Sequence, residues 1–233
     1  MRKKAVFFDL GGTLLVMRRD RIFRRVLIEE GWDVPLEKIH TTYLEEERWW
    51  LSHYGPRSMS PEQTTEAYRH LDQRVFSALF PDETEAESLR VSRQVRKRWP
   101  ELGNEIPLAL YPDVEPTLTR LKFEGFSMGL ISNAPADTAK TVESLGLNDY
   151  LDPVVISGSV GYTKPNPEIF RIAMKLADVQ PEMAAHVGDF YEADVAGAKN
   201  AGMLGILLDR EGSFDGPDCP RIGSLSEVHG CLM

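Results

Sequence analysis

The sequence has little cysteine, no long hydrophobic run and no long basic segment. Its two cysteines, Cys219 and Cys231, are too few for a disulfide framework or a Cys/His metal cluster, and we expect reduced thiols in a cytosol. No segment approaches the roughly eighteen apolar residues that a membrane-spanning helix needs. The formal net charge of −9 makes nucleic acid a poor partner. We therefore expect a cytoplasmic protein that binds neither membranes nor nucleic acid.

The basic start of the chain resembles the beginning of a signal peptide. However, Asp9 interrupts the apolar segment that follows Arg2-Lys3-Lys4, and no small-residue cleavage pattern comes after it. We therefore expect no such leader. With 233 residues, 42% of them hydrophobic, the chain can form a substantial core, and one domain or one domain with an insertion is expected.

The segment Val6–Leu15 is the most informative part of the chain. Apolar residues lead directly into Asp9, and Gly11, Gly12 and Thr13 follow. A short apolar run that ends in a turn is typical of a buried strand in a parallel sheet. Ligands of such sheets bind beyond the carboxyl ends of the strands, where Asp9 would lie. Taken alone, Asp9 is equally compatible with a turn or a helix cap.

The segment from about Arg18 to Glu105 is charged and aromatic, with apolar residues at helical spacing. Ser60-Pro61 predicts a helix start, because serine caps a helix and proline fits its first turn. We expect about four helices in this block, with the aromatic residues in their core. The predicted breakers are Gly31, Gly55-Pro56, Pro81 and Pro100.

The second half alternates between strands and helices. Strands are expected at 126–132, 153–157, 185–188 and 204–208, with helices between them. This alternation predicts a parallel sheet with helices on both faces. The segment after Asp209 is rich in Gly, Pro and Asp and is expected to loop over the surface. The predicted fold class is therefore α/β, with a Rossmann-like parallel sheet and an inserted all-helical domain.

Polar side chains follow four of the predicted strands, and parallel strands bring such ends to one edge of the sheet. Each has an ordinary explanation as a turn former, helix cap or exposed lysine, but their coincidence at one edge favours a site. His186, inside a predicted strand, is expected in the core or behind the site rather than as a catalyst. The polar residues at the strand ends are Asp9, Ser132, Asn133, Lys164, Asp189 and Asp194.

At these positions the sequence resembles the haloacid dehalogenase-like superfamily. The resemblance covers the sheet-forming segments, and the helical block matches as a cap of the right kind and place. The segments that carry it are Asp9-Leu10-Gly11-Gly12-Thr13, Ile131-Ser132-Asn133, Gly161-Tyr162-Thr163-Lys164-Pro165-Asn166-Pro167, and Val187-Gly188-Asp189 with Asp194.

The resemblance implies a role for each of these residues. Asp9 would be the nucleophile and Lys164 would neutralise it and the phosphate. Phosphate would be bound by Gly12, Thr13, Ser132, Asn133 and Lys164. Mg²⁺, which prefers oxygen ligands, would be held by Asp9, the carbonyl of Gly11, Asp189 and Asp194, although Asp194 could instead hold a metal-bound water or orient Lys164. The covalent intermediate would be an aspartyl-phosphate at Asp9.

One residue departs from the family pattern. Phosphatases of the superfamily usually carry a second Asp two residues after the nucleophile, which serves as general acid and base, and this chain has Gly11 there. Such a group contributes about 10²–10⁴-fold to the rate. An acid from the cap could replace it, the candidates being His40, His53, His70 and Tyr54, or the substrate could have a leaving group that needs none.

Two other interpretations stay open. The chain could catalyse other chemistry of the superfamily, as a 2-haloacid dehalogenase or as a phosphonate hydrolase with Lys38 as a weak candidate for the cap lysine that such an enzyme requires. The metal-binding form of the last motif counts against dehalogenation, which needs no metal. Alternatively, the chain could bind a phosphorylated ligand or a partner protein without turnover.

The sequence thus predicts a Mg²⁺-dependent phosphohydrolase for a small phosphorylated metabolite. We expect a core of residues 1–15 and 108–233 and a helical cap of residues 16–107 over the active edge of the sheet. Closure of the cap would exclude water and supply substrate contacts. The sequence leaves the substrate open and is compatible with a monomer or a homodimer.

Overall fold

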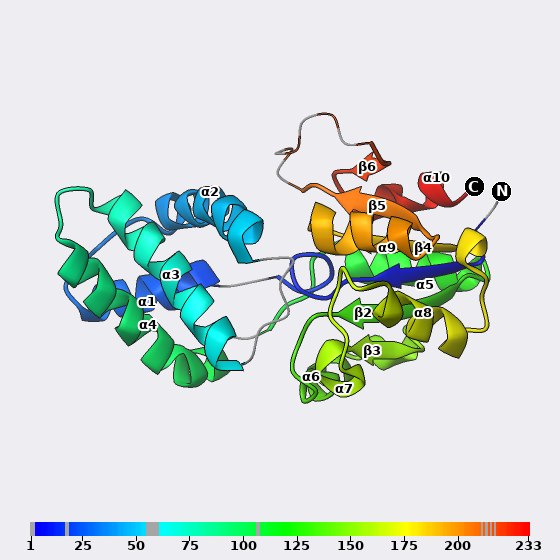
Figure 1. Cartoon of the computed structure of the whole chain (residues 1–233), viewed down its shortest axis with the longest axis horizontal. Coiled ribbons are helices and arrows are strands. Elements are labelled where there is room, and N and C mark those ends of the chain that lie inside the picture. The colour runs from blue at the N-terminus through cyan, green and yellow to red at the C-terminus, as the bar shows by residue number, and fades with distance from the viewer. Residues whose placement is uncertain are drawn as a thin grey trace. The chain divides into compact units, whose positions relative to one another are not determined.

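The computed structural model describes residues 3–16, 19–54, 61–105, 108–210, 212, 214, 216 and 218–233. The chain divides into two compact units, shown as ribbons in Figure 1. The sheet unit comprises Met1–Met17 and Ala109–Met233, and the helical unit comprises Arg18–Leu108. Each unit has its own hydrophobic core. None of the helices in the described part of the chain combines the length and hydrophobicity needed to span a bilayer.

Within its described residues, the sheet unit is built on six parallel strands, so the predicted Rossmann-like α/β fold is confirmed. Their order across the sheet is β3-β2-β1-β4-β5-β6. The strand with the nucleophile candidate therefore lies at the centre, between β2 and β4. The strands are β1 (Ala5–Phe8), β2 (Ser127–Ser132), β3 (Val154–Ile156), β4 (Ala184–Gly188), β5 (Leu204–Leu208) and β6 (Arg221–Ile222).

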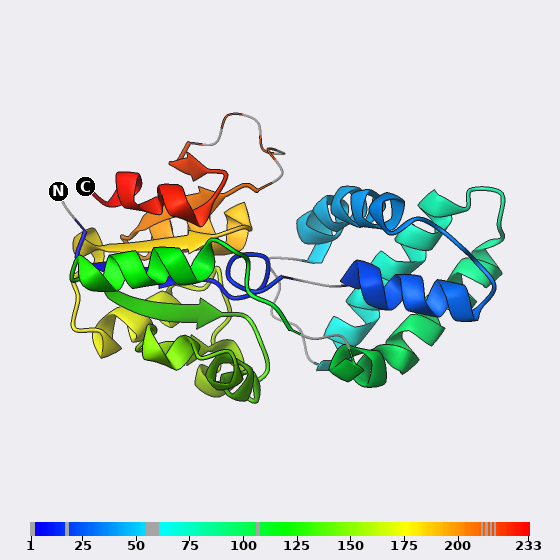
Figure 2. The ribbon, with the colours of Figure 1, turned by 180° about the vertical axis from the view of Figure 1, so that it is seen from behind.

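Helices cover both faces of this sheet. Residues of α5, α6 and α10 pack with one face of β1, and residues of α8 and α9 pack with the other. Figure 2, seen from behind, shows α5 and α10 in front of the strands. The helices are α5 (Val114–Phe123), α6 (Thr138–Ser144), α7 (Ser157–Val160), α8 (Pro167–Leu176), α9 (Gly197–Asn200) and α10 (Val228–Leu232).

Shorter helical turns connect these elements. A π-helical turn, Tyr191–Ala196, runs directly into α9. The 3-10 turns are Leu147–Asp149, Pro181–Met183 and Leu225–Glu227. The predicted start of α8 is present, because the side chain of Asn166 accepts a hydrogen bond from the N–H of Glu168 and Pro167 occupies the first turn.

The expectation that the segment after Asp209 loops over the surface is wrong for its last part. Residues 221–222 add strand β6 to the sheet, and Leu225, Val228 and Leu232 are buried in the core. These apolar residues recur every three to four positions, so one face of a short helix can be buried against the sheet. The Gly- and Pro-rich composition of the preceding segment concealed this pattern.

Four long helices make up the described part of the helical unit, as the spacing of its apolar residues predicts. Residues from all four helices form one core, and among the aromatic residues Trp50 and Phe76 are buried in it. Gly55-Pro56 and Ser60 lie outside the described residues. The helices are α1 (Arg19–Glu29), α2 (Leu36–Tyr54), α3 (Pro61–Leu79) and α4 (Glu85–Glu105).

The prediction that Pro100 ends a helix is wrong, because α4 continues through it to Glu105. An interior proline removes one backbone hydrogen bond and costs about 3 kcal/mol. Val95 and Leu102 are buried on either side of it, and burial of each such side chain gains about 1.5–3 kcal/mol. Packing on both sides of the proline therefore outweighs the lost hydrogen bond.

Candidate active site

Asp9 lies at the carboxyl end of the central strand. Its N–H donates to the carbonyl of Val187 in β4 (2.9 Å), and the residue is 8% exposed. In the sheet register, Phe8 pairs with Leu130 of β2 and Val187 of β4. The residues that follow these three strands are therefore brought to the same edge.

The two glycines after Asp9 have different conformations. Gly12 has a φ of 81°, and a Cβ there would collide with the carboxylate of Asp189. Gly12 is thus required both by the backbone and by the close approach of that carboxylate. Gly11 is not among the described residues with positive φ, and it forms an isolated bridge with Leu15.

Lys164 is buried and reaches the nucleophile candidate. Its Nζ lies 2.6 Å from Oδ1 of Asp9 and 2.5 Å from Oδ1 of Asp194. The amide of Asn133 binds the main chain of Lys164 at both ends: its Nδ2 donates to the Lys164 carbonyl (2.9 Å), and its Oδ1 accepts from the Lys164 N–H (2.7 Å). Asn133, at the end of β2, thus fixes the loop that carries the lysine.

Asp194 is held by three donors. Besides Lys164, its Oδ1 lies 3.0 Å from Nε2 of His186, and its Oδ2 accepts from the N–H of Phe190 (3.0 Å). A Cβ at Gly188 would collide with the Asp194 side chain, so glycine makes room for this carboxylate. Both carboxylate oxygens are thus engaged by the protein, and Asp194 orients Lys164.

The charges at this site are unevenly shared. Burial raises the pKa of Asp9 to about 6, with Lys164 lowering it and Asp194 raising it. Burial also acts to raise the pKa of Asp194, but Lys164 and His186 hold it well below its usual value. For Lys164, burial acts to lower the pKa, yet the two carboxylates hold it above its usual value. Lys164 therefore carries a positive charge and Asp194 is its ionised partner. The negative charge of Asp9 is stabilised less by its neighbours than that of Asp194.

His186 lies in β4 with no exposed surface, as expected for a core or supporting residue. The rings of Phe170 and His186 pack nearly perpendicular to each other, with their centroids 5.2 Å apart, and burial lowers the pKa of His186. Its Nε2 faces Asp194, while its Nδ1 has no hydrogen-bond partner among the residues that the structure describes. His186 therefore supports Asp194 from inside the sheet.

Three carboxylates form a group that fits a divalent cation. One oxygen each from Asp9, Asp189 and Asp194 lies within 4.8 Å of the others. Oxygen donors of this kind are the ligands that Mg²⁺ prefers, usually with several waters retained. Burial and the neighbouring Asp194 raise the pKa of Asp9, and a bound cation would favour its ionised form. The residues present thus fit Mg²⁺, with Asp9 and Asp189 as the carboxylates best suited to direct ligation.

Two further predicted residues lie beside this group. Thr13 is buried, and its Oγ1 lies 3.2 Å from Oδ1 of Asp189, to which it donates. Ser132 is the last residue of β2 and is 4% exposed. Their predicted contacts with phosphate, and that of Asn133, stay predictions. So does the ligation of a metal by the carbonyl of Gly11.

Sequence reasoning missed a supporting hydroxyl at Ser157. It follows β3, accepts a hydrogen bond from the N–H of Ala134 (3.1 Å), and donates to the Ala134 carbonyl (3.2 Å). It thereby fixes the loop after Ser132 and Asn133. The available signal was a polar residue directly after a strand, the same signal that identified the other strand ends.

The candidate acids of the inserted domain belong to the helical unit and have partners within it. Nδ1 of His40 lies 3.0 Å from Oδ2 of Asp20, and the hydroxyl of Tyr54 lies 2.5 Å from Nδ1 of His70. Nδ1 of His53 is 2.8 Å from the carbonyl of Trp49. These contacts give the side chains structural roles within the unit.

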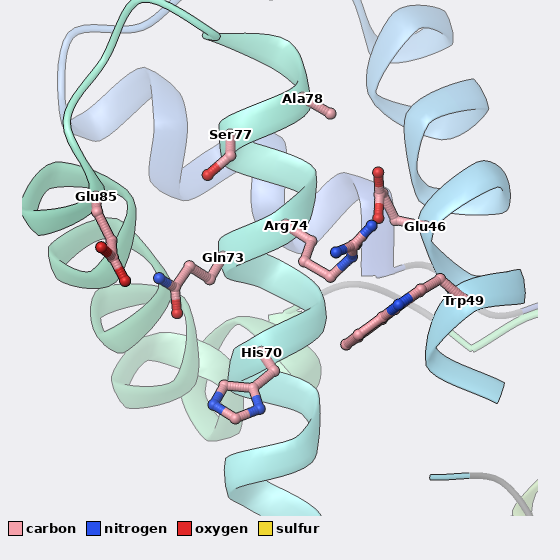
Figure 3. Close-up of a pocket in the computed structure, with 8 residues that line it drawn as sticks. All are labelled: Glu46, Trp49, His70, Gln73, Arg74, Ser77, Ala78 and Glu85. Atoms are coloured by element: carbon pink, nitrogen blue, oxygen red, sulfur yellow. Dashed lines mark hydrogen bonds and ion pairs between the residues drawn. The ribbon is translucent and has the colours of Figure 1, made fainter. Parts of the chain in front are cut away.

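His70 also lines a pocket of about 560 Å³ between α2, α3 and the start of α4, shown in Figure 3. Arg74 lies over the ring of Trp49, 3.9 Å from its centroid, and pairs with Glu46 (2.5 Å). Arg74 of α3 and Glu46 of α2, which both line this pocket, therefore already neutralise each other. Lys38, the candidate for a cap lysine, is an exposed residue of α2.

Comparison with known proteins identifies a family. A family model described as haloacid dehalogenase-like hydrolase matches residues 3–202. The glyceraldehyde 3-phosphate phosphatase of Methanopyrus kandleri is 40% identical over 101 residues, which is 43% of each chain. The phosphoserine phosphatase of Thermus thermophilus is 37% identical over 123 residues, 51% of this chain and 49% of that protein. The aligned part of the chain spans about half the length of these curated relatives.

Solved structures match over nearly the whole chain. A phosphatase from Thermococcus onnurineus is 28% identical and has a TM-score of 0.60. The match covers 98% of this chain and 97% of that protein. A 2-haloacid dehalogenase from Pseudomonas syringae pv. Tomato DC3000 is 27% identical, has a TM-score of 0.58, and is covered over 98% of its length by 99% of this chain. The overall architecture is thus similar to proteins of both activities.

Proposed function

The chain belongs to the haloacid dehalogenase-like hydrolase family, and we propose that it is a Mg²⁺-dependent phosphohydrolase that forms an aspartyl-phosphate at Asp9. One observation carries the proposal. A buried ammonium group, that of Lys164, lies 2.6 Å from Asp9 beside a group of three carboxylates. A carboxylate nucleophile and a phosphate are both negatively charged, so the attack needs cations beside them. The Lys164 ammonium is one such cation, and the three carboxylates could hold a second.

Asp9 performs the covalent step. A carboxylate oxygen of Asp9 bonds to phosphorus as the bond from phosphorus to the leaving oxygen breaks, and that oxygen departs with the bonding electrons. Water then attacks the aspartyl-phosphate and releases phosphate and the free carboxylate. Lys164 holds the attacking carboxylate and offers positive charge to the phosphate, so that positioning and electrostatics carry most of the catalysis.

Asp9, Asp189 and the carbonyl of Gly11 would hold Mg²⁺, which neutralises charge on the transferring phosphoryl group when bound. Asp194 keeps Lys164 in place, because both of its oxygens are occupied by protein donors. Thr13 orients Asp189 through its hydroxyl. Ser132 binds the phosphate oxygens together with backbone N–H groups of the turn after Asp9, since such turns form anion-binding concavities. The N–H of Gly12 is not one of them, because it donates to the carbonyl of Leu15 (2.9 Å).

Gly11 determines which substrates react well. The residue cannot protonate a leaving group, so substrates whose leaving oxygen is a weak base are favoured over alkyl phosphates. Without a general base at position 11, hydrolysis of the aspartyl-phosphate is also slow, because no side chain there activates the water. We therefore expect a burst of product in the first turnover, followed by a slower steady state.

The helical unit serves as the cap of this enzyme. Its closure would exclude water and supply the contacts that select the substrate. The two curated relatives are named as phosphatases of glyceraldehyde 3-phosphate and phosphoserine, both small phosphorylated metabolites. A metabolite of this size class is the substrate that we propose here.

The test is a screen of small phosphorylated compounds with Mg²⁺ and with a chelator. The proposal requires phosphate release that depends on Mg²⁺ and is faster for aryl and acyl phosphates than for alkyl phosphates. Release of halide from 2-haloacids in the presence of chelator would instead assign the chemistry of a dehalogenase. Absence of turnover, together with thermal stabilisation by Mg²⁺ and a phosphorylated ligand, would assign a binding protein.

A further inference from the structure

A fifth strand end also carries a charged residue near the nucleophile loop. Arg210 follows β5, and its guanidinium makes a bidentate pair with Asp113: Nη1 donates to Oδ2 (2.8 Å) and Nη2 to Oδ1 (3.0 Å). The side chain of Arg210 is 16% exposed and lies over the ring of Tyr111, 3.8 Å from its centroid. A planar guanidinium held on its face and at its edge has little freedom to move.

Asp113 is itself held by the C-terminal segment. Its Oδ2 accepts from Oγ of Ser224 (2.7 Å) and from the N–H of Leu225 (2.9 Å). Burial acts to raise the pKa of Asp113, but these donors and Arg210 keep it below its usual value. The pair thus ties together the loop after β5, the start of α5 and the segment before α10.

The same guanidinium reaches the loop that follows Asp9. Nη2 of Arg210 donates to the carbonyl of Thr13 (3.0 Å). The hydroxyl of this threonine donates to Asp189, one of the three carboxylates of the metal group. The loop is also bonded to the return segment, because the N–H of Tyr111 donates to the carbonyl of Leu14 (3.0 Å). A continuous chain of contacts therefore runs from Arg210 through Thr13 to Asp189.

We propose that Arg210 is a positioning residue for the metal-binding carboxylates, acting through Thr13 and oriented by Asp113. The role rests on the metal site of the proposed function. Arginine is required because two parallel hydrogen bonds to Asp113 and one to the Thr13 carbonyl need the planar fork of donors. Lysine would keep the charge without that fork.

The test measures the Mg²⁺ concentration at the midpoint of binding by isothermal titration calorimetry, at a temperature where every variant is folded, with the metal alone and no substrate. Loss of a group that orients a ligand costs about 10–100-fold in metal affinity. Arg210→Ala and Arg210→Lys should raise the midpoint by at least about 10-fold, with Asp113→Asn changing it in the same direction. Arg120→Ala, which removes an arginine from an exposed pair with Glu124, is the control and should leave it unchanged.

The midpoint separates positioning from general stability, since a merely structural residue lowers the melting temperature without moving the midpoint. Thr13→Val in combination with Arg210→Ala tests the route. If Arg210 acts through Thr13, the double variant loses no more Mg²⁺ affinity than the more affected of the two single variants. Multiplicative losses would overturn the route, and an unchanged midpoint in both Arg210 variants would overturn the role. If the wild-type chain does not respond to Mg²⁺, the metal site and the positioning role both fail.

Discussion

Replacing Lys164 by Met tests the arrangement of charges at the candidate site most severely. The substitution keeps an unbranched side chain and removes the ammonium that contacts both Asp9 and Asp194. Lys164 and Asp194 are almost fully buried, so solvent cannot replace the lost charge. Two carboxylates would then lie close together, with no lysine between them.

Removing one partner of a buried ion pair costs about 3–5 kcal/mol of unfolding free energy. In a chain of this size that corresponds to a fall of ~6–20 °C in melting temperature. The deficit should depend on pH. Without Lys164, the folded-state pKa of Asp9 rises above its wild-type value of about 6, so a proton can replace the lost charge at low pH. The deficit should therefore be largest in alkaline buffer and shrink as the pH falls toward about 6.

Differential scanning calorimetry across a pH series provides the measurement, in chelator and again with Mg²⁺. Mg²⁺ should restore part of the lost stability, because a divalent cation neutralises the same carboxylates. Lys175→Met on α8 is the control, since Lys175 is an exposed residue and the same atoms are removed. A melting temperature of Lys164→Met equal to that of the control, or a deficit that does not change with pH, would refute the electrostatic reasoning.

Three further predictions concern other parts of the chain. Gly11→Asp should raise Mg²⁺-dependent hydrolysis of alkyl phosphates by about 10²–10⁴-fold, because the new carboxyl group can protonate the leaving oxygen. Unchanged rates would show that a side chain at position 11 does not reach the leaving group. Asp72 is a buried residue of α3 whose Oδ2 lies 2.6 Å from Nε of Arg96, and burial raises its pKa to about 6. Its contribution to unfolding free energy therefore grows as the pH falls from about 6 to about 4 and is lost above that. Urea unfolding of Asp72→Asn should lack this slope, and equal slopes in both proteins would disprove the assignment. Leu232→Ala should cost about 2–5 kcal/mol in the same assay, against little for the exposed Met233→Ala, and equal costs would contradict burial of α10.

Much of the sheet unit was predictable because its signals are local. A buried parallel strand is short and apolar, and a polar residue or a glycine turn marks its end. Asp9 and Asp189 were selected in this way, since strand order places such ends at one edge whatever the details of packing. Lys164 was selected by its place in the loop after a predicted strand. The start of α8 was similarly predictable, because Asn166 and Pro167 act on the helix that they begin.

Features set by tertiary contacts could not be predicted from local signals. Pro100 breaks an isolated helix, but packing on both sides of it keeps α4 intact. The last part of the chain joins the sheet because its few apolar residues complete a core made by distant strands. The pairing of Arg210 with Asp113 joins residues 97 positions apart, and nothing near either residue indicates its partner.

The central claim is that Asp9 becomes phosphorylated during turnover. The most direct measurement is to quench the reaction with acid during hydrolysis of an aryl phosphate and to locate the phosphoryl group on the protein by mass spectrometry. We predict a phosphoryl group on Asp9 in the wild-type chain, and neither label nor turnover in Asp9→Asn. Mg²⁺-dependent turnover by Asp9→Asn at the wild-type rate, or label on another residue, would contradict the claim.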